Sequence, residues 1–240
     1  TQVNANLYQP STSDTFAMPV RTGAKTDGAT STAAIYLLDT IDLTDQWQIS
    51  AGLRAEHYST TTDIITVQAA ATPQTIPVGT LLGSGAKSSD NLFSYKIGTV
   101  YKPTADGSVY LSYATSQLPP GGANFSLSTA ATNQNNPMLA PQKGSNLELG
   151  TKWNLLNNKL FATAAVFESV NKNELVRDDV NSYLSAGEKT VRGVEFGLVG
   201  MPLSGFELSA GLALLDPEIT RGARYASAPT EGAVIQWTPK

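Results

Sequence analysis

The segment WQISAGLRAE, residues 47–56, alternates apolar and polar side chains with a period of two. Trp47, Ile49 and Leu53 fall on one face, whereas Arg54 and Glu56 fall on the other. Because successive side chains of a β-strand point to opposite faces, this pattern predicts a strand with one apolar and one polar face. Charges in the middle of the strand indicate that the polar face meets water or other polar groups.

Seven further segments have the character of strands, so the sequence predicts about eight in all. The alternation is clear in residues 93–102, 146–155, 193–198 and 206–214, and adequate in residues 109–115. Residues 33–43 and 160–170 are also strand-like, but their patterns leave open which side chains share a face.

Short and long connections alternate between these segments. Tight turns are predicted at residues 44–46, 105–107, 157–158 and 203–205, where Asp, Asn and Gly supply the conformations of short hairpins. Long polar loops are predicted at about 61–90, 117–143 and 173–188, and the terminal segments 1–30 and 217–240 also resemble loops. The short turns therefore lie at one end of the predicted sheet and the long loops at the other.

The composition excludes several classes of protein. The 240 residues include no cysteine and one histidine, His57, which excludes disulfide scaffolds and cysteine-ligated metal sites and argues against a hydrolytic triad. A net charge of −4 argues against a nucleic-acid binder, which needs a basic face. Charged residues make up 15%, below the roughly 25% of ordinary soluble domains.

Two-faced strands with short turns at one end and long loops at the other are typical of an antiparallel transmembrane β-barrel. Lipid cannot hydrogen-bond a backbone, so the strands must pair with one another and show lipid their apolar face. Aromatic residues are expected at both membrane interfaces. Those near the tight turns are Trp47, Tyr101, Trp153 and Phe206, and those near the opposite ends are Tyr58, Phe93 and Tyr113. The predicted fold is all-β, a partial barrel of about eight strands.

Four blocks of the chain resemble the barrel of TonB-dependent outer-membrane receptors. They are residues 34–47 followed by 52–54, residues 93–98 leading to 110–113, residues 141–153, and residues 191–195. The third block resembles the family's P-E-K-x-x-x-x-E-x-G-x-K strand, with Gln142 where Glu is common. The fourth, VRGVE, is similar to the family's x-x-G-x-E strand.

Within this family, LPPGGANF at residues 118–125 resembles the catecholate siderophore receptors. GAKTDG at residues 23–28 and WTPK at residues 237–240 point the same way. The resemblance implies that residues 1–240 form part of a larger receptor barrel domain, with the family's N-terminal plug and its last strands lying outside them.

The resemblance implies uptake of ferric siderophores at the bacterial outer membrane, and not catalysis. Its implied partners are a ferric siderophore, outer-membrane lipid, and TonB–ExbB–ExbD acting through the plug region, with no nucleic acid. Iron would arrive as cargo in the siderophore complex, so no resident cofactor, metal site or catalytic residue is expected.

A ferric catecholate is anionic and aromatic, so its site requires Arg or Lys donors beside aromatic rings. The candidates are Lys87, Phe125, Arg177 and Tyr183 in the loops and Arg192 where its strand leaves a loop. The alternative for each is a solvated or loop-packing role, and Arg192 could also pair with residues near Glu195. Charges of the lumenal wall, which pair across strands or contact a plug, are Arg54, Glu56, Lys96, Glu148, Lys152, Glu195 and Glu207.

Two other functions are compatible with a sheet of this kind. A small self-contained barrel, serving as an anchor or adhesin, would need its first and last strands to pair. A soluble extracellular β-domain that binds glycans would have uniformly apolar inward faces. A piece of a receptor barrel instead predicts an open sheet with two unpaired edges.

Overall fold

A computed structural model of the chain describes residues 8, 21–69, 76–177, 182–222 and 231–234. Its elements are β1 (Lys25–Asp42), β2 (Trp47–Val67), β3 (Leu81–Thr104), β4 (Gly107–Leu118), β5 (Gln142–Leu155), β6 (Leu160–Arg177), β7 (Tyr183–Leu203) and β8 (Phe206–Arg221). The all-β class is therefore confirmed. No helix in the described ranges is long and apolar enough to cross a membrane.

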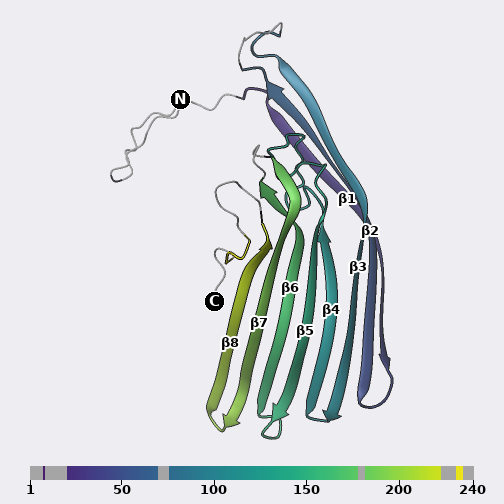
Figure 1. The fold of residues 1–240 in the computed structure, drawn as a ribbon, viewed down its shortest axis with the longest axis vertical. Coiled ribbons are helices and arrows are strands. Elements are labelled where there is room, and N and C mark those ends of the chain that lie inside the picture. Colours follow the sequence, from purple (N-terminus) through teal and green to yellow (C-terminus); the bar gives the residue numbers. More distant parts are fainter. Residues whose placement is uncertain (1–7, 9–20, 70–75, 178–181, 223–230, 235–240) are drawn as a thin grey trace. The chain divides into compact units, whose positions relative to one another are not determined.

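The strands form one eight-stranded sheet in chain order from β1 to β8 (Figure 1). From β3 to β8 each strand pairs antiparallel with the next. Within the described residues β1 and β8 are the two edges and do not pair with each other, so the sheet is not closed. This is the open sheet expected of part of a receptor barrel, and it differs from a self-contained barrel of eight strands.

The chain divides into two compact units, residues 1–27 with 63–85 and residues 28–62 with 86–240. In the first unit, the end of β2 and the start of β3 form a hairpin. The N–H of Gln68 donates to the carbonyl of Thr80 at 2.9 Å, and that of Gly79 donates to the carbonyl of Gln68 at 2.9 Å. The second unit contains most of the sheet and all the site residues described below.

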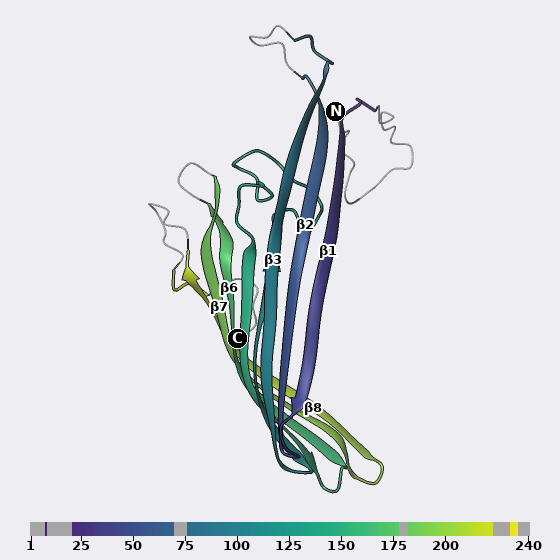
Figure 2. The ribbon, with the colours of Figure 1, turned by 90° about the vertical axis from the view of Figure 1, so that its right-hand side faces the viewer.

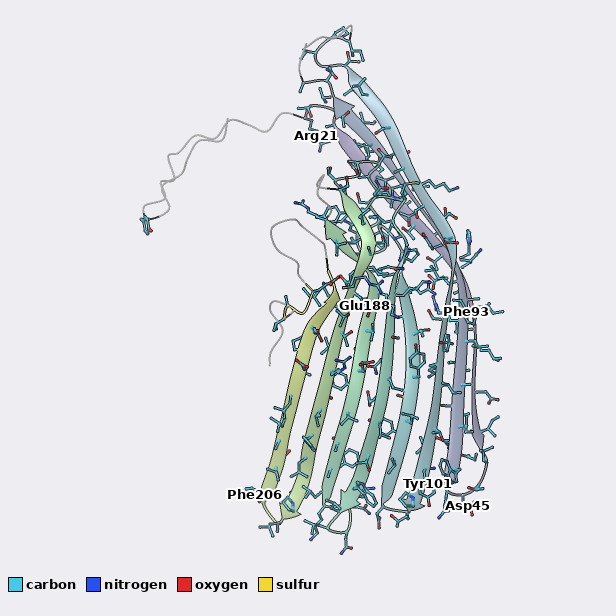
Figure 3. The ribbon with its side chains drawn as sticks, in the orientation of Figure 1. Arg21, Asp45, Phe93, Tyr101, Glu188 and Phe206 are labelled. Carbon is cyan, nitrogen blue, oxygen red and sulfur yellow. The ribbon has the colours of Figure 1, made fainter. Side chains whose placement is uncertain are left out.

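All four predicted tight turns are confirmed. In the β1–β2 turn, the hydroxyl of Thr44 accepts the N–H groups of Gln46 and Trp47 at 3.2 and 3.0 Å. The β5–β6 turn places residues 156–158 at positive φ, and the β7–β8 turn does so with Gly205. Figure 3 labels Asp45, Tyr101 and Phe206 at this end of the strands.

Two of the three predicted long loops are shorter than expected, because strand structure continues into them. Strands cover 61–67 and 81–90 of the first loop, and 173–177 and 183–188 of the third. β1 and β8 likewise extend into the terminal segments predicted as loops (Figure 2). The reason is that Thr and Ile favour strands, as in residues 59–67, even where polar residues fall on both faces and the alternation is lost. The loop at 117–143 is confirmed, since β4 ends at Leu118 and β5 begins at Gln142.

The strand register shows which side chains share a face. One cross-strand row on the apolar face consists of Leu111, Leu149, Val166, Val194 and Leu214. A neighbouring row on the polar face consists of Tyr110, Gly150, Ala165, Glu195 and Ala213. The register thus shows which side chains of β6 share a face, which its sequence did not determine. Large apolar side chains of the apolar face are exposed, Leu212 by 54% for example, and such a surface needs an apolar solvent.

Aromatic residues gather toward both ends of the apolar face. Near the tight turns, the rings of Trp47 and Tyr101 are 4.7 Å apart between centroids. Toward the other end, Tyr95 lies 6.3 Å from Phe93 and 5.9 Å from Tyr113. These two groups agree with the predicted interface aromatics.

Tyr58 corrects one detail of that prediction. Only 3% of it is exposed, and its hydroxyl is hydrogen-bonded to that of Ser88 at 3.0 Å. It alternates in phase with Arg54 and Glu56, which places it on the polar face. Tyr58 is therefore a buried residue of the second unit and not an interface aromatic.

Candidate ligand-binding site

The β4–β5 loop, residues 119–141, is built from its own hydrogen-bonded turns. The carbonyl of Gly121 accepts the N–H of Phe125 at 2.8 Å. Three asparagine side chains accept the backbone N–H two residues further on, at 3.2, 2.9 and 2.8 Å: Asn124, Asn133 and Asn136. Such side-chain turns stabilise a loop that has no regular secondary structure.

Two contacts attach this loop to β1 and β2. The hydroxyl of Thr62 accepts the N–H of Leu127 at 2.8 Å, with Thr62 0% and Leu127 1% exposed. On β1, the carbonyl oxygen of Phe125 lies 1.9 Å from where a β-carbon on Gly28 would be. The loop therefore covers part of the polar face of β1 and β2.

The same loop is attached to β6 and β7. The N–H of Tyr183 donates to the carbonyl of Ala131 at 2.9 Å, and the amide of Asn173 donates to the carbonyl of Pro141 at 2.8 Å. Arg177 and Tyr183 are cross-strand partners, and the guanidinium of Arg177 lies 5.2 Å from the centre of the Tyr183 ring. The loop that carries Phe125 is thus hydrogen-bonded to Tyr183, over whose ring Arg177 lies. The loop and these three residues, predicted separately from the sequence, are called the loop assembly below.

A hollow of about 200 Å³ opens beside the β4–β5 loop. Its walls are residues 118–124, Gln134, Asn135, Leu139, Ala140, Gln142 and Leu175. The lining combines side-chain amides with proline, leucine and glycine, so it offers both hydrogen-bonding groups and apolar surface.

A bulge in β6 creates a second polar group, which was not predicted from the sequence. Asn173 has a φ of 58°, and the pairing with β7 shifts there, from Lys172 opposite Glu188 to Glu174 opposite Gly187. An extra residue in one strand reverses the alternation beyond it. The one signal in the sequence was Asn173 itself, because Asn adopts a positive φ more readily than most residues.

Beyond the bulge, the carboxylate of Glu174 accepts hydrogen bonds from Asn171 and from Lys189, the latter at 3.0 Å. These three residues line a hollow of about 630 Å³ over β4–β7, together with residues such as Ser116 and Asn146. The hollow is large enough for a small ligand or for a polypeptide segment.

The predicted wall charges lie on the polar face and are partly joined by Tyr110. Its hydroxyl donates to Glu148 at 2.5 Å, and the ammonium of Lys152 lies 5.2 Å from its ring centre. Glu195 lies in the same cross-strand row as Tyr110. Tyr110 could not be predicted as part of this group from the sequence, because an aromatic residue on a polar face does not stand out in an alternation pattern.

The remaining wall residues lie on the same face. Arg54 forms an ion pair with Glu56, 2.5 Å between Nη2 and Oε2. The side chain of Lys96 lies 3.0 Å from where a β-carbon on Gly52 would be, which places it beside Arg54 and Glu56 on this face. Glu207 also lies on this face, because it alternates in phase with Ser209.

Because Gly150 has no side chain, the ring of Tyr110 can occupy the space beside it. A β-carbon there would lie 2.4 Å from the Tyr110 ring and hydroxyl, so Gly150→Ala must displace the ring from Glu148. We expect the full-length receptor to lose roughly 1–3 kcal/mol of unfolding free energy, measured by denaturant titration in lipid. Gly211→Ala is the control on the same face: its β-carbon would meet one atom, at 3.8 Å, and should be neutral or stabilising. Equal effects of the two substitutions would contradict the role assigned to Tyr110.

Lys87 and Arg192 are not brought to this assembly. Lys87 lies between the buried residues Ala86 and Ser88, and therefore on the other face of β3. Arg192 donates to Glu168 at 2.7 Å and lies on the face opposite Glu195, so the suggested pairing near Glu195 is wrong.

Arg192 and Glu168 instead mark where the apolar face ends. The row Leu147, Glu168, Arg192 and Asp216 follows directly on the row from Leu149 to Leu214. Three of its four members are charged, whereas the preceding row is wholly apolar. The lipid-facing surface of β5–β8 therefore ends between these two rows.

In the described part of the chain, no three His, Cys, Asp or Glu side chains are grouped so that they could hold a metal ion. What the assembly offers is a cation beside one aromatic ring, an exposed ring at Phe125, and amide groups around a small hollow. These groups are suited to non-covalent binding of an anionic, aromatic molecule.

Comparison with known proteins identifies the family. The family model described as TonB dependent receptor-like, beta-barrel matches residues 1–239. The catecholate siderophore receptor Fiu of Escherichia coli K12 is 34% identical over 230 residues, which are 92% of this chain and 30% of that protein. The probable TonB-dependent siderophore receptor PiuA of Acinetobacter baumannii is 34% identical over 199 residues, 82% of this chain and 25% of that protein.

Solved structures give the same result. The closed form of the ferric-catecholate import receptor Fiu from E. coli K12 superposes with a TM-score of 0.80 at 31% identity, covering 95% of this chain and 34% of that one. The siderophore receptor PiuA from A. baumannii gives 0.74 at 32% identity, covering 90% and 30%. The chain thus spans about 30% of the length of the relative Fiu. It belongs to the TonB-dependent receptor β-barrel family of outer-membrane proteins.

Proposed function

We propose that this chain belongs to a receptor that takes up ferric siderophores, of the catecholate type, across the outer membrane. The family consists of receptors and transporters, and the chain is similar over 92% of its length to a protein named as a catecholate siderophore receptor. Ferric iron is the cargo, bound in the siderophore, and no catalytic step is required.

The observation that carries the proposal is the assembly of Phe125, Arg177 and Tyr183 around the β4–β5 loop. A ferric catecholate carries negative charge and flat aromatic rings. A guanidinium can donate hydrogen bonds to its oxygens, while aromatic side chains pack against its rings. The five candidates proposed for ligand contact are thereby ranked, with these three ahead of Lys87 and Arg192.

We further propose that the sheet is part of a larger barrel. Among the described residues, no strand pairs with the outer edge of β1 or β8, and backbone groups of such an edge cannot remain unpaired in lipid. Neighbouring strands of the same receptor would pair with β1 and β8, and a plug would contact the wall charges Arg54, Glu56, Lys96, Glu148, Lys152 and Glu195. Energy for uptake would come from TonB–ExbB–ExbD through that plug.

The test is ligand selectivity of the full-length receptor. We expect the purified receptor to bind the ferric complex of 2,3-dihydroxybenzoate saturably. It should not bind a ferric hydroxamate complex, which has no catechol ring. Intrinsic fluorescence quenching or calorimetry measures both. Binding of the hydroxamate complex alone, or of neither complex, would overturn the catecholate assignment.

A further inference from the structure

Phe125 has a backbone conformation that normally favours glycine. Its φ is 55°, and its N–H donates to the carbonyl four residues back, Gly121, at 2.8 Å. This arrangement ends a single helical turn, and the residue that ends it in the left-handed region is usually Gly. The other described non-glycine residues with positive φ lie in the β5–β6 turn or at the β6 bulge.

The side chain of Phe125 is not used to fill a core, because it is 54% exposed. A bulky residue in the left-handed region is strained, and such strain persists where the surrounding structure imposes it. The chain therefore maintains an exposed aromatic ring at a position that a glycine would occupy without strain. A ring kept under these conditions points to use in binding.

Two contacts impose this conformation, and one of them is buried. Thr62 accepts the N–H of Leu127, two residues after Phe125, and both partners are fully buried. Gly28 has no side chain, which lets the carbonyl of Phe125 lie against β1. Gly28 and Phe125 each belong to a sequence segment that resembles catecholate receptors.

We propose that Thr62 is a positioning residue, which holds the β4–β5 loop as a preassembled platform and presents the ring of Phe125 to a catechol ring of the ligand. This inference rests on the proposed function and specifies how its site is organised. The loop is already ordered by Thr62, Gly28 and its own turns, so binding does not require it to fold. Ordering a loop on binding reduces affinity, and prior ordering removes that cost.

The principal test is Thr62→Val in the full-length receptor, with the ferric complex of 2,3-dihydroxybenzoate as ligand. Valine keeps the shape and removes the acceptor, leaving the N–H of Leu127 buried without a partner. We expect the dissociation constant to rise about tenfold and hydrogen exchange to increase in residues 121–127. Thr62→Ser keeps the hydroxyl and should restore both values.

Thr60→Val is the matched control. Thr60 is also fully buried, and its hydroxyl is bonded to that of Thr30 on β1 at 2.8 Å, so its partner belongs to the sheet and not to the loop. It should leave ligand affinity and loop exchange unchanged. Equal weakening by Thr60→Val and Thr62→Val would overturn the proposal, because general loosening of the sheet would then explain both.

Phe125→Gly separates binding from structure. Glycine relieves the positive φ, so the receptor should be at least as stable to denaturant, yet bind the catecholate complex about tenfold more weakly. If the unmodified receptor binds the catecholate complex, and Phe125→Gly or Thr62→Val binds it with the same affinity, this inference is overturned. The proposed function would still stand. If the unmodified receptor bound no catecholate complex, the proposed function would fail, and loop exchange in Thr62→Val would still show whether Thr62 orders the loop.

Discussion

Replacing Ala210 with arginine is expected to destabilise the full-length receptor in a lipid bilayer by about 2–4 kcal/mol. Ala210 lies on the apolar face of β8, opposite Leu198 of β7. It is roughly midway between Phe206, beside the tight turn, and Asp216 in the charged row. An arginine there has no nearby water, so its charge is poorly solvated. Denaturant titration of the receptor in phospholipid vesicles measures the loss.

Ser209→Arg is the matched control for this substitution. Ser209 is the preceding residue, is also exposed, and pairs with Val199 on the polar face. The same arginine there meets the lumen and not lipid, so we expect a loss below 1 kcal/mol, roughly a quarter of the lipid-face value. A larger loss for Ser209→Arg than for Ala210→Arg would show that the two faces have been assigned the wrong way round.

Truncating Arg177 to alanine should weaken binding of the ferric 2,3-dihydroxybenzoate complex by about tenfold or more in the full-length receptor. The guanidinium of Arg177 lies 5.2 Å from the centre of the Tyr183 ring, and the backbone N–H of Tyr183 is hydrogen-bonded to the β4–β5 loop. Removing it takes away a charge-assisted donor to the anionic ligand and leaves the Tyr183 ring without its cation. Equilibrium titration with the complex measures the change.

Lys87→Ala removes one positive charge as well and is the control for Arg177→Ala. Its position between the buried residues Ala86 and Ser88 places it on the other face of β3. We expect its dissociation constant to stay within about twofold of the unmodified receptor, since only the long-range part of the charge effect remains. A loss as large as that of Arg177→Ala would mean that binding depends on overall charge and not on the loop assembly.

Much of the sheet is predictable because strand alternation is a local property. In β8, the residues from Phe206 to Leu214 show by themselves which side chains face lipid and which face the lumen. The tight turns are equally local, since Asn157 and Asn158 adopt the positive φ that the β5–β6 turn needs. The ends of the strands near the long loops could not be predicted in this way. Beyond the charged row of Glu168 and Arg192, toward the long loops, polar residues occur on both faces, and alternation no longer separates strand from loop.

The candidate site was predictable in residue type but not in assembly. An anionic aromatic ligand requires cations and rings, which directs attention to Arg177, Tyr183 and Phe125. Their association depends on hydrogen bonds between distant segments, such as Tyr183 with Ala131. Glu174 was missed because one extra residue at Asn173 reverses its direction.

The sequence by itself determined the two-faced strands, the tight turns and the family, because these depend on neighbouring residues and on ordered blocks along the chain. The tertiary structure alone decided the face of β6, the true length of the strands, and the contacts of Phe125 with Gly28 and of Leu127 with Thr62. The physical reason is that side-chain alternation is set within one strand. Register, bulges and loop anchoring are set by hydrogen bonds between segments far apart in sequence, which no local pattern encodes.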